Sequence, residues 1–347
     1  MAKTIFDYFI VGQGIAGTML SYFLLQKGKS VLVFDDGHHT SASTNALGVC
    51  NPVRGRNLKL ASENAAVFPF ARETYKRLED LLGCEFCRDI DQIRFFLDAK
   101  QRRNWERKKD DHAYAQYFKG EVAPNSFDKI ACELGGIRIA GTFYMDGQSM
   151  LPRYRAWLEQ NAAPCEAAFE YDQLKITGNG VRYGDKTAKT IVFCEGYRVY
   201  QNPFFDWLPH TPMKGEWLTV KFEDFDPGFM INKSLMIIPV GNGEYRAGAT
   251  FDMEDLTIAP TEDGRNELIR RLERIMLTPF EIVSHAAGIR PKTKDNQPIL
   301  GRNPEHGQLA VFGGWGSIGF IQTPFYASEF ADYLEGEDAS DLTFDLE

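Results

Sequence analysis

The chain has 347 residues, and its hydrophobic content of 44% and charged content of 25% are ordinary for a soluble globular protein. This length suits two interlocked domains better than one simple core. The formal net charge of −9 argues against a broad nucleic-acid-binding surface.

The first elements have the pattern of a βαβ unit. Residues 5–11 and 30–34 are apolar runs without polar alternation, which predicts two strands of a parallel sheet that is covered on both faces. Residues 15–27 between them predict a helix. Gly28 suits the position after its C-terminus, where a positive φ costs glycine little.

The apolar residues near the N-terminus do not predict a membrane span. Asp7, Gln13 and three glycines interrupt residues 5–25, which leaves the run well short of the roughly 20 apolar residues that a span needs. No signal peptide is evident, so we expect a cytoplasmic protein whose six cysteines are reduced. The Cys84–Cys87 pair lacks further ligands at metal-binding spacing, so no metal site is predicted.

The middle of the chain mixes helices and strands. A helix is predicted from about Ser62 to Leu82, and a second at residues 151–160 with Pro152 in its first turn. Shorter segments of mixed character fall at residues 93–97 and 137–144. Five strands are predicted after these, at residues 174–177, 191–194, 216–222, 234–239 and 245–249.

The C-terminal part contains an amphipathic helix, a strand and a glycine-rich loop. Thr261 is the predicted cap of the amphipathic helix. The buried stripe of this helix is expected to comprise Leu268, Ile269, Leu272, Ile275 and Met276. A strand at residues 309–313 leads into the glycine-rich loop 314–319. The last helix is predicted at about residues 324–334, with Thr323 as its N-cap and Pro324 as its first residue.

The glycine-rich turn between the first strand and the first helix predicts a dinucleotide site. Gly12 allows the tight turn, Gly14 lets a pyrophosphate approach the backbone, and Gly17 lets the helix pack close to the strand. The helix N-terminus then faces the phosphates with free N–H groups. Asp35 closes the second strand, and we expect it to accept hydrogen bonds from a ribose, which disfavours NADP. The turn alone does not distinguish FAD from NAD.

Five further motifs carry a resemblance to a known family. Residues 288–301, which contain Gly-Ile-Arg-Pro and end in Pro-Ile-Leu-Gly, resemble the G-x-R-P-x-t-x-D-x-x-P-x-x-G stretch of the D-amino-acid-oxidase superfamily of flavoenzymes. This superfamily includes glycine and sarcosine oxidases. The loop at residues 313–319, the Ser/Ala-rich segment 41–48, the turn 213–216 and the hairpin 241–250 resemble other motifs of the same superfamily, in the same order.

The resemblance implies an α/β fold (α+β overall) of two parts. A Rossmann-like, discontinuous FAD-binding domain is expected at residues 1–85, 146–205 and 286–347. A mainly antiparallel-sheet substrate domain is expected at residues 86–145 and 206–285.

The resemblance also implies that FAD is held non-covalently. Members with covalent flavin carry a Cys or a His at positions where this sequence has Ala286-Ala287 and Asn45. The glycine-rich turn and the resemblance together indicate as cofactor-binding residues Gly12, Gly14, Ile15, Ala16, Gly17, Asp35, Asp36, Ser43, Asn45, Ala46, Gly48, Gly196, Gly288, Arg290, Gly314, Trp315, Gly316, Ser317, Ile318, Gly319 and Phe320. In the loop 314–319, backbone N–H groups would meet the flavin pyrimidine; the alternative is a loop needed only for packing.

The implied reaction is oxidation of a C–N bond in an amino acid or secondary amine, with hydride transfer to flavin N5 and O2 or an unknown group as electron acceptor. Arg290 matches the arginine that anchors the substrate carboxylate in the glycine-oxidase branch; the alternative is a salt bridge. Arg246 stands where relatives of sarcosine oxidase carry a lysine that assists oxygen; the alternative is an arginine on the sheet surface. Tyr245 alternates with Arg246 and is a candidate to face the substrate.

Two other functions stay open. The loop 314–319, the segment 70–78 and the hairpin 245–251 also resemble the C-terminal FAD domain of the bifunctional enzyme that trims carboxymethylaminomethyl wobble uridine in tRNA. That function would make tRNA a partner, but the methyltransferase domain of that enzyme and an obvious basic surface are both absent, so we favour a small-molecule substrate. The third alternative is a flavin-binding or redox-sensing protein without turnover.

Overall fold

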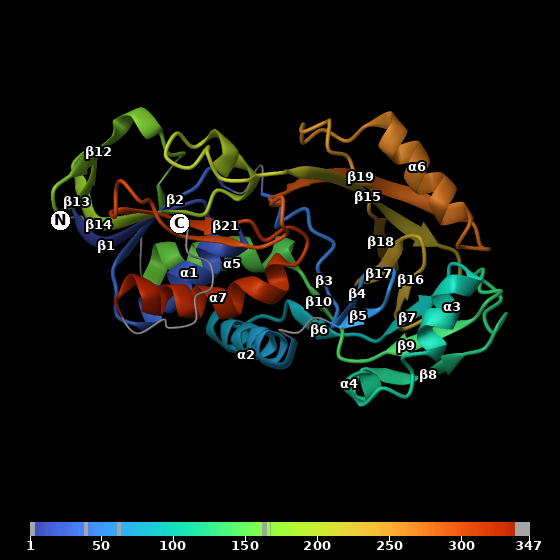
Figure 1. Cartoon of the computed structure of the whole chain (residues 1–347). Coiled ribbons are helices and arrows are strands. Elements are labelled where there is room, and N and C mark those ends of the chain that lie inside the picture. The colour runs from blue at the N-terminus through green and yellow to red at the C-terminus, as the bar shows by residue number, and fades with distance from the viewer. Residues whose placement is uncertain (1–3, 38–40, 61–63, 162–164, 167, 337–347) are drawn as a thin grey trace.

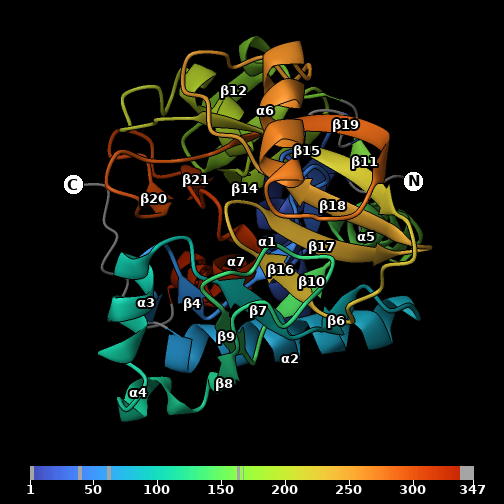
Figure 2. The ribbon, with the colours of Figure 1, turned by 90° about the vertical axis from the view of Figure 1, so that its right-hand side faces the viewer.

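The computed structural model describes residues 4–37, 41–60, 64–161, 165–166 and 168–336. Figure 1 shows two lobes, each built around a large sheet. In the first lobe, helices pack against a mainly parallel sheet. The second lobe contains the other large sheet, and the chain crosses between the lobes several times (Figures 1 and 2).

The centre of the first sheet is parallel, and most of the side chains on β1, β2, β14 and β21 are buried. Its strands lie in the order β11-β2-β1-β14, with β21 paired to the C-terminal half of β14. The parallel strands are β1 (Ile5–Val11), β2 (Val31–Phe34), β11 (Cys165–Glu166), β14 (Lys186–Phe193) and β21 (Leu309–Gly313). Three antiparallel strands extend the sheet: β12 (Leu174–Thr177), β13 (Gly180–Tyr183) and β20 (Ile299–Arg302).

Four helices form one hydrophobic core with this sheet. They are α1 (Ile15–Gln26), α2 (Asn64–Leu82), α5 (Gly147–Asn161) and α7 (Gly319–Leu334). Alternation along β1 divides its side chains between two cores: Tyr8 and Ile10 pack with the helices, whereas Phe9 and Val11 pack on the opposite face. The sheet is therefore covered on both faces, as the unbroken apolar runs predicted.

The second sheet has the order β19-β15-β18-β17-β16-β7-β9-β8, and only the β16–β7 pair is parallel. Its strands are β7 (Gln92–Phe95), β8 (Phe118–Val122), β9 (Gly136–Ile139), β15 (Met213–Phe222), β16 (Met230–Asn232), β17 (Met236–Gly241), β18 (Glu244–Gly248) and β19 (Phe280–Arg290). One face packs against α6 (Glu262–Glu273) through a separate apolar core that contains Leu268 and Leu272. The predicted fold class, a Rossmann-like α/β sheet with a second, mainly antiparallel sheet, is confirmed.

Short elements complete the fold. They are β3 (Val49–Cys50), β4 (Val53–Arg54), β5 (Lys59–Leu60), β6 (Cys87–Asp89), β10 (Phe143–Met145), α3 (Ala99–Glu106), α4 (His112–Ala115) and the 3₁₀ turns η1 (Tyr171–Gln173) and η2 (Gly196–Gln201). β3, β10 and β6 form a small sheet between the two lobes. Within the described ranges, no helix is both long and apolar enough to cross a membrane.

The first elements and α6 have the predicted character. β1, β12 and β21 have the predicted bounds, and α1 and β2 differ by one residue at one end. The Thr261 hydroxyl caps α6 by accepting from the Gly264 N–H at 3.0 Å. In the predicted stripe, Leu268 and Leu272 are buried and Ile269 is half-buried, whereas Ile275 and Met276 are buried but lie beyond the end of α6, so the stripe was extended too far. The predicted start of α2 at Ser62 lies outside the described residues.

Two proline assignments were wrong. α5 begins at Gly147, so Pro152 lies in its second turn rather than its first. α7 begins at Gly319, with Ile318 as N-cap, so Thr323 and Pro324 lie inside the helix and not at its start. Pro324 leaves the Phe320 carbonyl without its helical donor, because proline has no N–H. The buried Tyr75 hydroxyl donates to this carbonyl at 2.6 Å and replaces the missing bond.

Candidate active site

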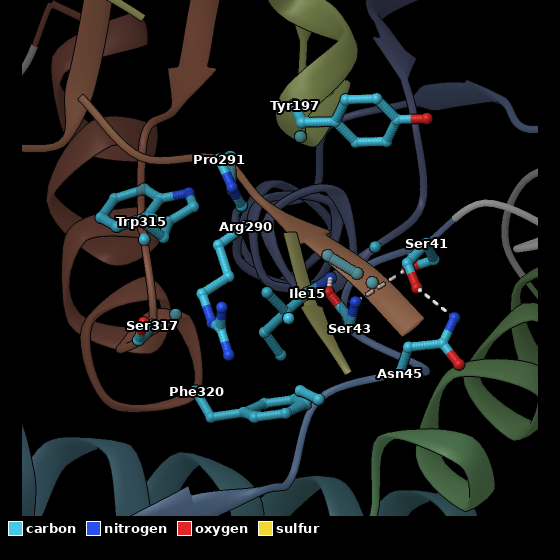
Figure 3. Close-up of a pocket in the computed structure, with 18 of the residues that line it drawn as sticks. Ile15, Ser41, Ser43, Asn45, Tyr197, Arg290, Pro291, Trp315, Ser317 and Phe320 are labelled. Atoms are coloured by element: carbon cyan, nitrogen blue, oxygen red, sulfur yellow. Dashed lines mark hydrogen bonds between the residues drawn. The ribbon is translucent and has the colours of Figure 1, made fainter. Parts of the chain in front are cut away.

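One cavity of about 840 Å³ connects the glycine-rich turn of the first sheet to the second sheet (Figure 3). It is lined by all of the predicted cofactor-binding residues except Gly17 and Gly314. These two glycines lie just outside the lining. The cavity therefore brings together motifs from both ends of the chain, and the contact of each residue with a cofactor stays a prediction.

The glycines of the first turn are required by close backbone approaches. Gly12 has φ +92°, and a Cβ there would lie 2.6 Å from the Cys194 carbonyl oxygen. A Cβ on Gly17 would lie 1.9 Å from the Gly12 carbonyl oxygen, so only glycine lets α1 pack this close to β1. Gly14 is the N-cap of α1 and has no side chain, so the N-terminus of the helix borders the cavity with only its first N–H, that of Ile15, bonded to a side chain of the described residues. This is the geometry of an anion site at a helix N-terminus.

A serine-rich segment closes over this helix N-terminus (Figure 3). The Ser43 hydroxyl accepts from the Ile15 N–H at 3.0 Å, and the Ser41 hydroxyl accepts from the Ser43 N–H at 3.2 Å. Asn45 donates to the Ser41 carbonyl at 3.3 Å. The segment is therefore held by its own hydrogen bonds next to the position where a pyrophosphate would lie.

Asp35 and Asp36 both have cationic partners. The Asp35 carboxylate accepts from the N–H groups of Gln13 and Gly37, each at 2.8 Å, and pairs with Arg155 of α5 at 2.7 Å. Asp36 pairs with Arg198 at 3.2 Å. Sequence reasoning missed Arg155, because it lies 120 residues from Asp35 on a helix whose role no local motif reveals.

The C-terminal glycine-rich loop forms another part of the cavity wall. Gly314 has φ +79°, and the Gly316 N–H donates to the Pro291 carbonyl at 2.9 Å, which joins the loop to the end of β19. α7 begins directly after this loop, and its N-cap Ile318 supplies no side-chain acceptor. Since α7 starts five residues earlier than expected, its N-terminus lies at the loop itself rather than beyond it.

Arg290 projects from the end of β19 into the cavity (Figure 3). Its guanidinium donates only to backbone carbonyls, those of Lys214 at 3.2 Å and Thr250 at 3.4 Å. No carboxylate from the described part of the chain lies within 4.0 Å of it, which excludes the salt-bridge alternative for those residues. Burial lowers the pKa of Arg290 to about 10, so the cation lacks the stabilisation that an anion would supply.

The structure places the other two catalytic candidates, Arg246 and Tyr245, outside the cavity lining. Arg246 emerges on the same face of β18 as the cavity residue Gly248. It donates to the Gln148 carboxamide oxygen, and its guanidinium carbon lies 4.9 Å from the ring centre of Trp217. It is 7% exposed, so it is not a surface arginine. Tyr245 lies on the opposite face of the sheet, in the core under α6, where its hydroxyl donates to the Phe225 carbonyl at 2.7 Å. Alternation in a strand puts neighbours on opposite faces, so Tyr245 and Arg246 cannot both face the cavity, and neither lines it.

Residues 7–333 match the protein family described as FAD dependent oxidoreductase (DAO). The chain belongs to this family. It is similar to a glycine oxidase of Bacillus licheniformis, at 24% identity over 95% of this chain and 93% of that protein. It is also similar to the tRNA 5-methylaminomethyl-2-thiouridine biosynthesis bifunctional protein MnmC of Marinobacter nauticus, at 22% identity over 94% of this chain and 55% of that protein. The solved structure of glycine oxidase from Geobacillus kaustophilus superposes with a TM-score of 0.84 at 19% identity, covering 99% and 97% of the two chains.

The cavity of this FAD-dependent oxidoreductase suits its cofactor. The N-termini of α1 and α7 lie side by side on the wall of one continuous cavity, since a Cβ on Gly319 would be 3.4 Å from Ile15 Cγ2. Near α7, the buried indole N–H of Trp315 has no partner among the described residues, so a donor is available to a bound group. The N-terminus of α1 suits a pyrophosphate, and the neighbouring N-terminus of α7 suits a group with negative charge on the electron-accepting ring system.

Several cavity residues were not found from the sequence. Trp217 donates its indole N–H to the Asn45 carbonyl at 2.7 Å and so joins the second sheet to the serine-rich segment. Glu195 lines the opposite end, where it accepts from Tyr171 and Asn202. The loop that contains Phe251 also reaches the cavity. No local motif marks these residues, because only the crossing of the chain between the lobes brings them together.

Proposed function

We propose that this FAD-dependent oxidoreductase oxidises the C–N bond of a small amino acid or secondary amine that carries a carboxylate. The observation that supports this proposal is the Arg290 guanidinium, which projects into the cavity with no carboxylate partner within 4.0 Å among the described residues. A guanidinium binds a carboxylate through two parallel hydrogen bonds, so it fixes the orientation of the substrate as well as its position.

Residues around Arg290 define the place of the substrate. The Phe251 ring lies 4.9 Å from the guanidinium carbon, and Phe320 lies below the guanidinium in Figure 3. When bound, FAD supplies the hydride acceptor at flavin N5, and the oxidised substrate is released as an imine that water hydrolyses. The N-terminus of α7 contributes partial positive charge at the loop 316–319, which favours negative charge on a group bound there.

Replacement of Arg290 tests the proposal. Arg290→Ala should lower kcat/KM for carboxylate-bearing amines by about 100-fold, mainly through KM, since a charged hydrogen bond contributes about 1.5–3 kcal/mol. The measurement is anaerobic reduction of the flavin, followed by its visible absorbance, with glycine, sarcosine, proline and D-amino acids. Arg138→Ala, at an arginine of β9 that pairs with Asp91 outside the cavity, is the control. An unchanged KM in Arg290→Ala would remove the anchoring role.

The similarity to MnmC supports a competing function on modified tRNA. The chain covers 55% of that protein, and a carboxymethylaminomethyl group is itself a secondary amine with a carboxylate. The same residues would therefore serve, but the substrate would be a macromolecule. Flavin reduction by modified tRNA, with no reduction by any small amine, would establish this function in place of the first.

Non-covalent attachment of FAD is a separate part of the proposal. Asn45 lies in the cavity at the position that carries a histidine in some members with covalent flavin. Asparagine has no nucleophilic nitrogen that forms a stable bond to the flavin. Acid precipitation of the yellow protein should release all of its flavin into the supernatant; a yellow pellet would contradict this.

A further inference from the structure

Arg94, on β7, is a buried arginine without a partner. Its side chain is 7% exposed, and its Nε atom is fully buried with no hydrogen-bond acceptor. No hydrogen bond or ion pair connects its guanidinium to any residue in the described ranges, and burial lowers its pKa to about 10. A buried cation is normally paired or hydrogen-bonded, because its desolvation is costly. No described residue supplies the missing acceptor, so a bound anion is one group that could supply it.

Arg94 stands at the end of a row of cavity-lining residues. Across neighbouring strands, Gly248 is opposite Met236, Met236 is opposite Asn232, and Asn232 is opposite Arg94. The first three of these line the cavity. Figure 2 shows the four strands β18, β17, β16 and β7 side by side. Register partners share a face of the sheet, so Arg94 emerges next to Asn232 on the side of the sheet that faces the cavity. Neither Arg94 nor Gln92 is part of the cavity lining, so a ligand in the cavity would reach them past Asn232.

Gln92 adds a second free donor on the same face. It lies two residues before Arg94, so its side chain points to the same side of β7. Its Oε1 atom accepts from Asn51 at 2.9 Å and from Asn232 at 3.3 Å, which fixes the orientation of the carboxamide. Its Nε2 atom is buried and has no acceptor in the described part of the chain. Arg94 and Gln92 thus both have hydrogen-bond donors that no described residue uses. The one acceptor between them, Gln92 Oε1, is already bonded to Asn51 and Asn232.

We propose that Arg94 and Gln92 form a second anion subsite, which binds a terminal carboxylate or phosphate of the substrate. This inference rests on the proposed amine oxidation, in which Arg290 holds the carboxylate next to the amine. β19 and β7 are separated by five strand spacings, roughly 24 Å. A simple amino acid such as glycine does not bridge that separation, even with both arginines extended. The substrate class is therefore an amine with a carboxylate near the nitrogen and a second acidic group on an extended arm.

A matched substrate series tests the subsite through turnover. The probes are N-alkylglycines of one chain length that end in a carboxylate, a phosphate or a neutral carboxamide. The wild-type enzyme should prefer the better acid over the carboxamide by at least tenfold in kcat/KM, and the comparison of the two acids identifies the preferred anion. Arg94→Met should bring the ratio of acid to carboxamide close to one, and Gln92→Met should reduce it. Equal use of acid and carboxamide by the wild type, or a preference kept in Arg94→Met, would overturn the proposal.

A binding measurement on the FAD-loaded protein is independent of turnover. Adipate should raise the Tm of the wild type by more than that of Arg94→Met, in which only Arg290 remains to bind a carboxylate. Without ligand, Arg94→Met should have a higher Tm than the wild type, because the variant removes an unpaired buried cation; an arginine with a structural role would give a lower Tm. Arg138→Met, on the opposite face of β9, should change neither result. If no amine reduces the flavin but adipate binding depends on Arg94, the proposed reaction is wrong and the subsite is supported. If adipate does not change the Tm of the wild type, the subsite is wrong.

Discussion

The position of the Arg290 guanidinium depends on the absence of a side chain at Gly215. A Cβ at Gly215 would lie 2.2 Å from Nη2 and 2.3 Å from Nη1 of Arg290, well inside contact distance. Gly215 lies opposite Gly288 on the paired strand, two residues from Arg290. The turn at 213–216 therefore matters for the site as well as for the sheet, because it provides the space in which the guanidinium lies.

Gly215→Ala is expected to impair substrate binding without unfolding the protein. The methyl group displaces a flexible side-chain end, so stability should change little, whereas a displacement of about 1 Å can cost roughly 100-fold in kcat/KM. The measurement is the steady-state rate with the best amine together with Tm. Gly178→Ala, at a turn where a Cβ would meet nothing within 4 Å, is the control. A wild-type KM in Gly215→Ala would show that the guanidinium need not occupy this position.

Residue roles were predictable only where a motif fixes the local backbone. The turn around Gly12 and the position of Arg290 follow from local sequence patterns, and both lie at the cavity as expected. The assignment of Tyr245 and Arg246 required knowledge of which face of β18 is directed to the cavity. Both faces of that strand are buried, so the hydrophobic pattern does not distinguish them. Asp35 lies at the cavity as expected, but its partner Arg155 was not found from the sequence.

At the scale of elements, unbroken apolar runs and clear N-caps predicted the ends of helices and strands accurately. Prolines, when taken as markers of a helix start, did not. β1, α1 and β21 are buried throughout or nearly so, which makes their sequence signal strong. β19 was not predicted as a strand, because its burial alternates irregularly and it ends in the motif around Arg290. α7 was placed too late, since Pro324 favours a helix start unless the freed carbonyl finds another donor. That donor is Tyr75 of α2, which is 245 residues from Phe320 in sequence.

Tyr75→Phe is expected to lower the free energy of unfolding by about 1–3 kcal/mol, because it leaves the buried Phe320 carbonyl without a donor. In the Pro324→Ala background the cost should be smaller, since alanine supplies the helical N–H that proline lacks. Urea unfolding of the four proteins gives the coupling, expected at about 1 kcal/mol. Tyr333→Phe, near the C-terminus of α7, the helix that contains Pro324, is the control. Additive effects would show that Tyr75 does not compensate for the proline.

At the scale of the whole molecule, the cavity is formed by segments from both ends of the chain and from its middle. The first sheet takes its strands from residues 5–34, 165–193 and 299–313, whereas the second takes them from residues 92–139 and 213–290.

We propose the domain division at residues 1–85, 146–205 and 286–347 for the FAD-binding domain, and 86–145 and 206–285 for the substrate domain. β19 crosses this division, so its motif reaches the cofactor end from the second sheet. Limited proteolysis with and without FAD tests the division: FAD should protect sites near residues 205 and 286 together.

The stability of the whole molecule should depend on pH through Glu195, which lines the cavity. Burial raises the pKa of Glu195 from 4.5 to about 7, and Tyr171 and Asn202 donate to its carboxylate. Because the pKa is higher in the folded state, protonation favours folding: this contribution is complete below pH 4.5 and is lost as the pH rises to about 7.

Over that window the free energy of unfolding should fall by roughly 1–3 kcal/mol more in the wild type than in Glu195→Gln. A glutamine at 195 can accept from Asn202 and donate to the Tyr171 oxygen, so the variant keeps both bonds. Urea unfolding from pH 4.5 to 8 gives the comparison, with the exposed Glu305→Gln as control, and equal slopes in wild type and Glu195→Gln would mean that Glu195 is ionised throughout.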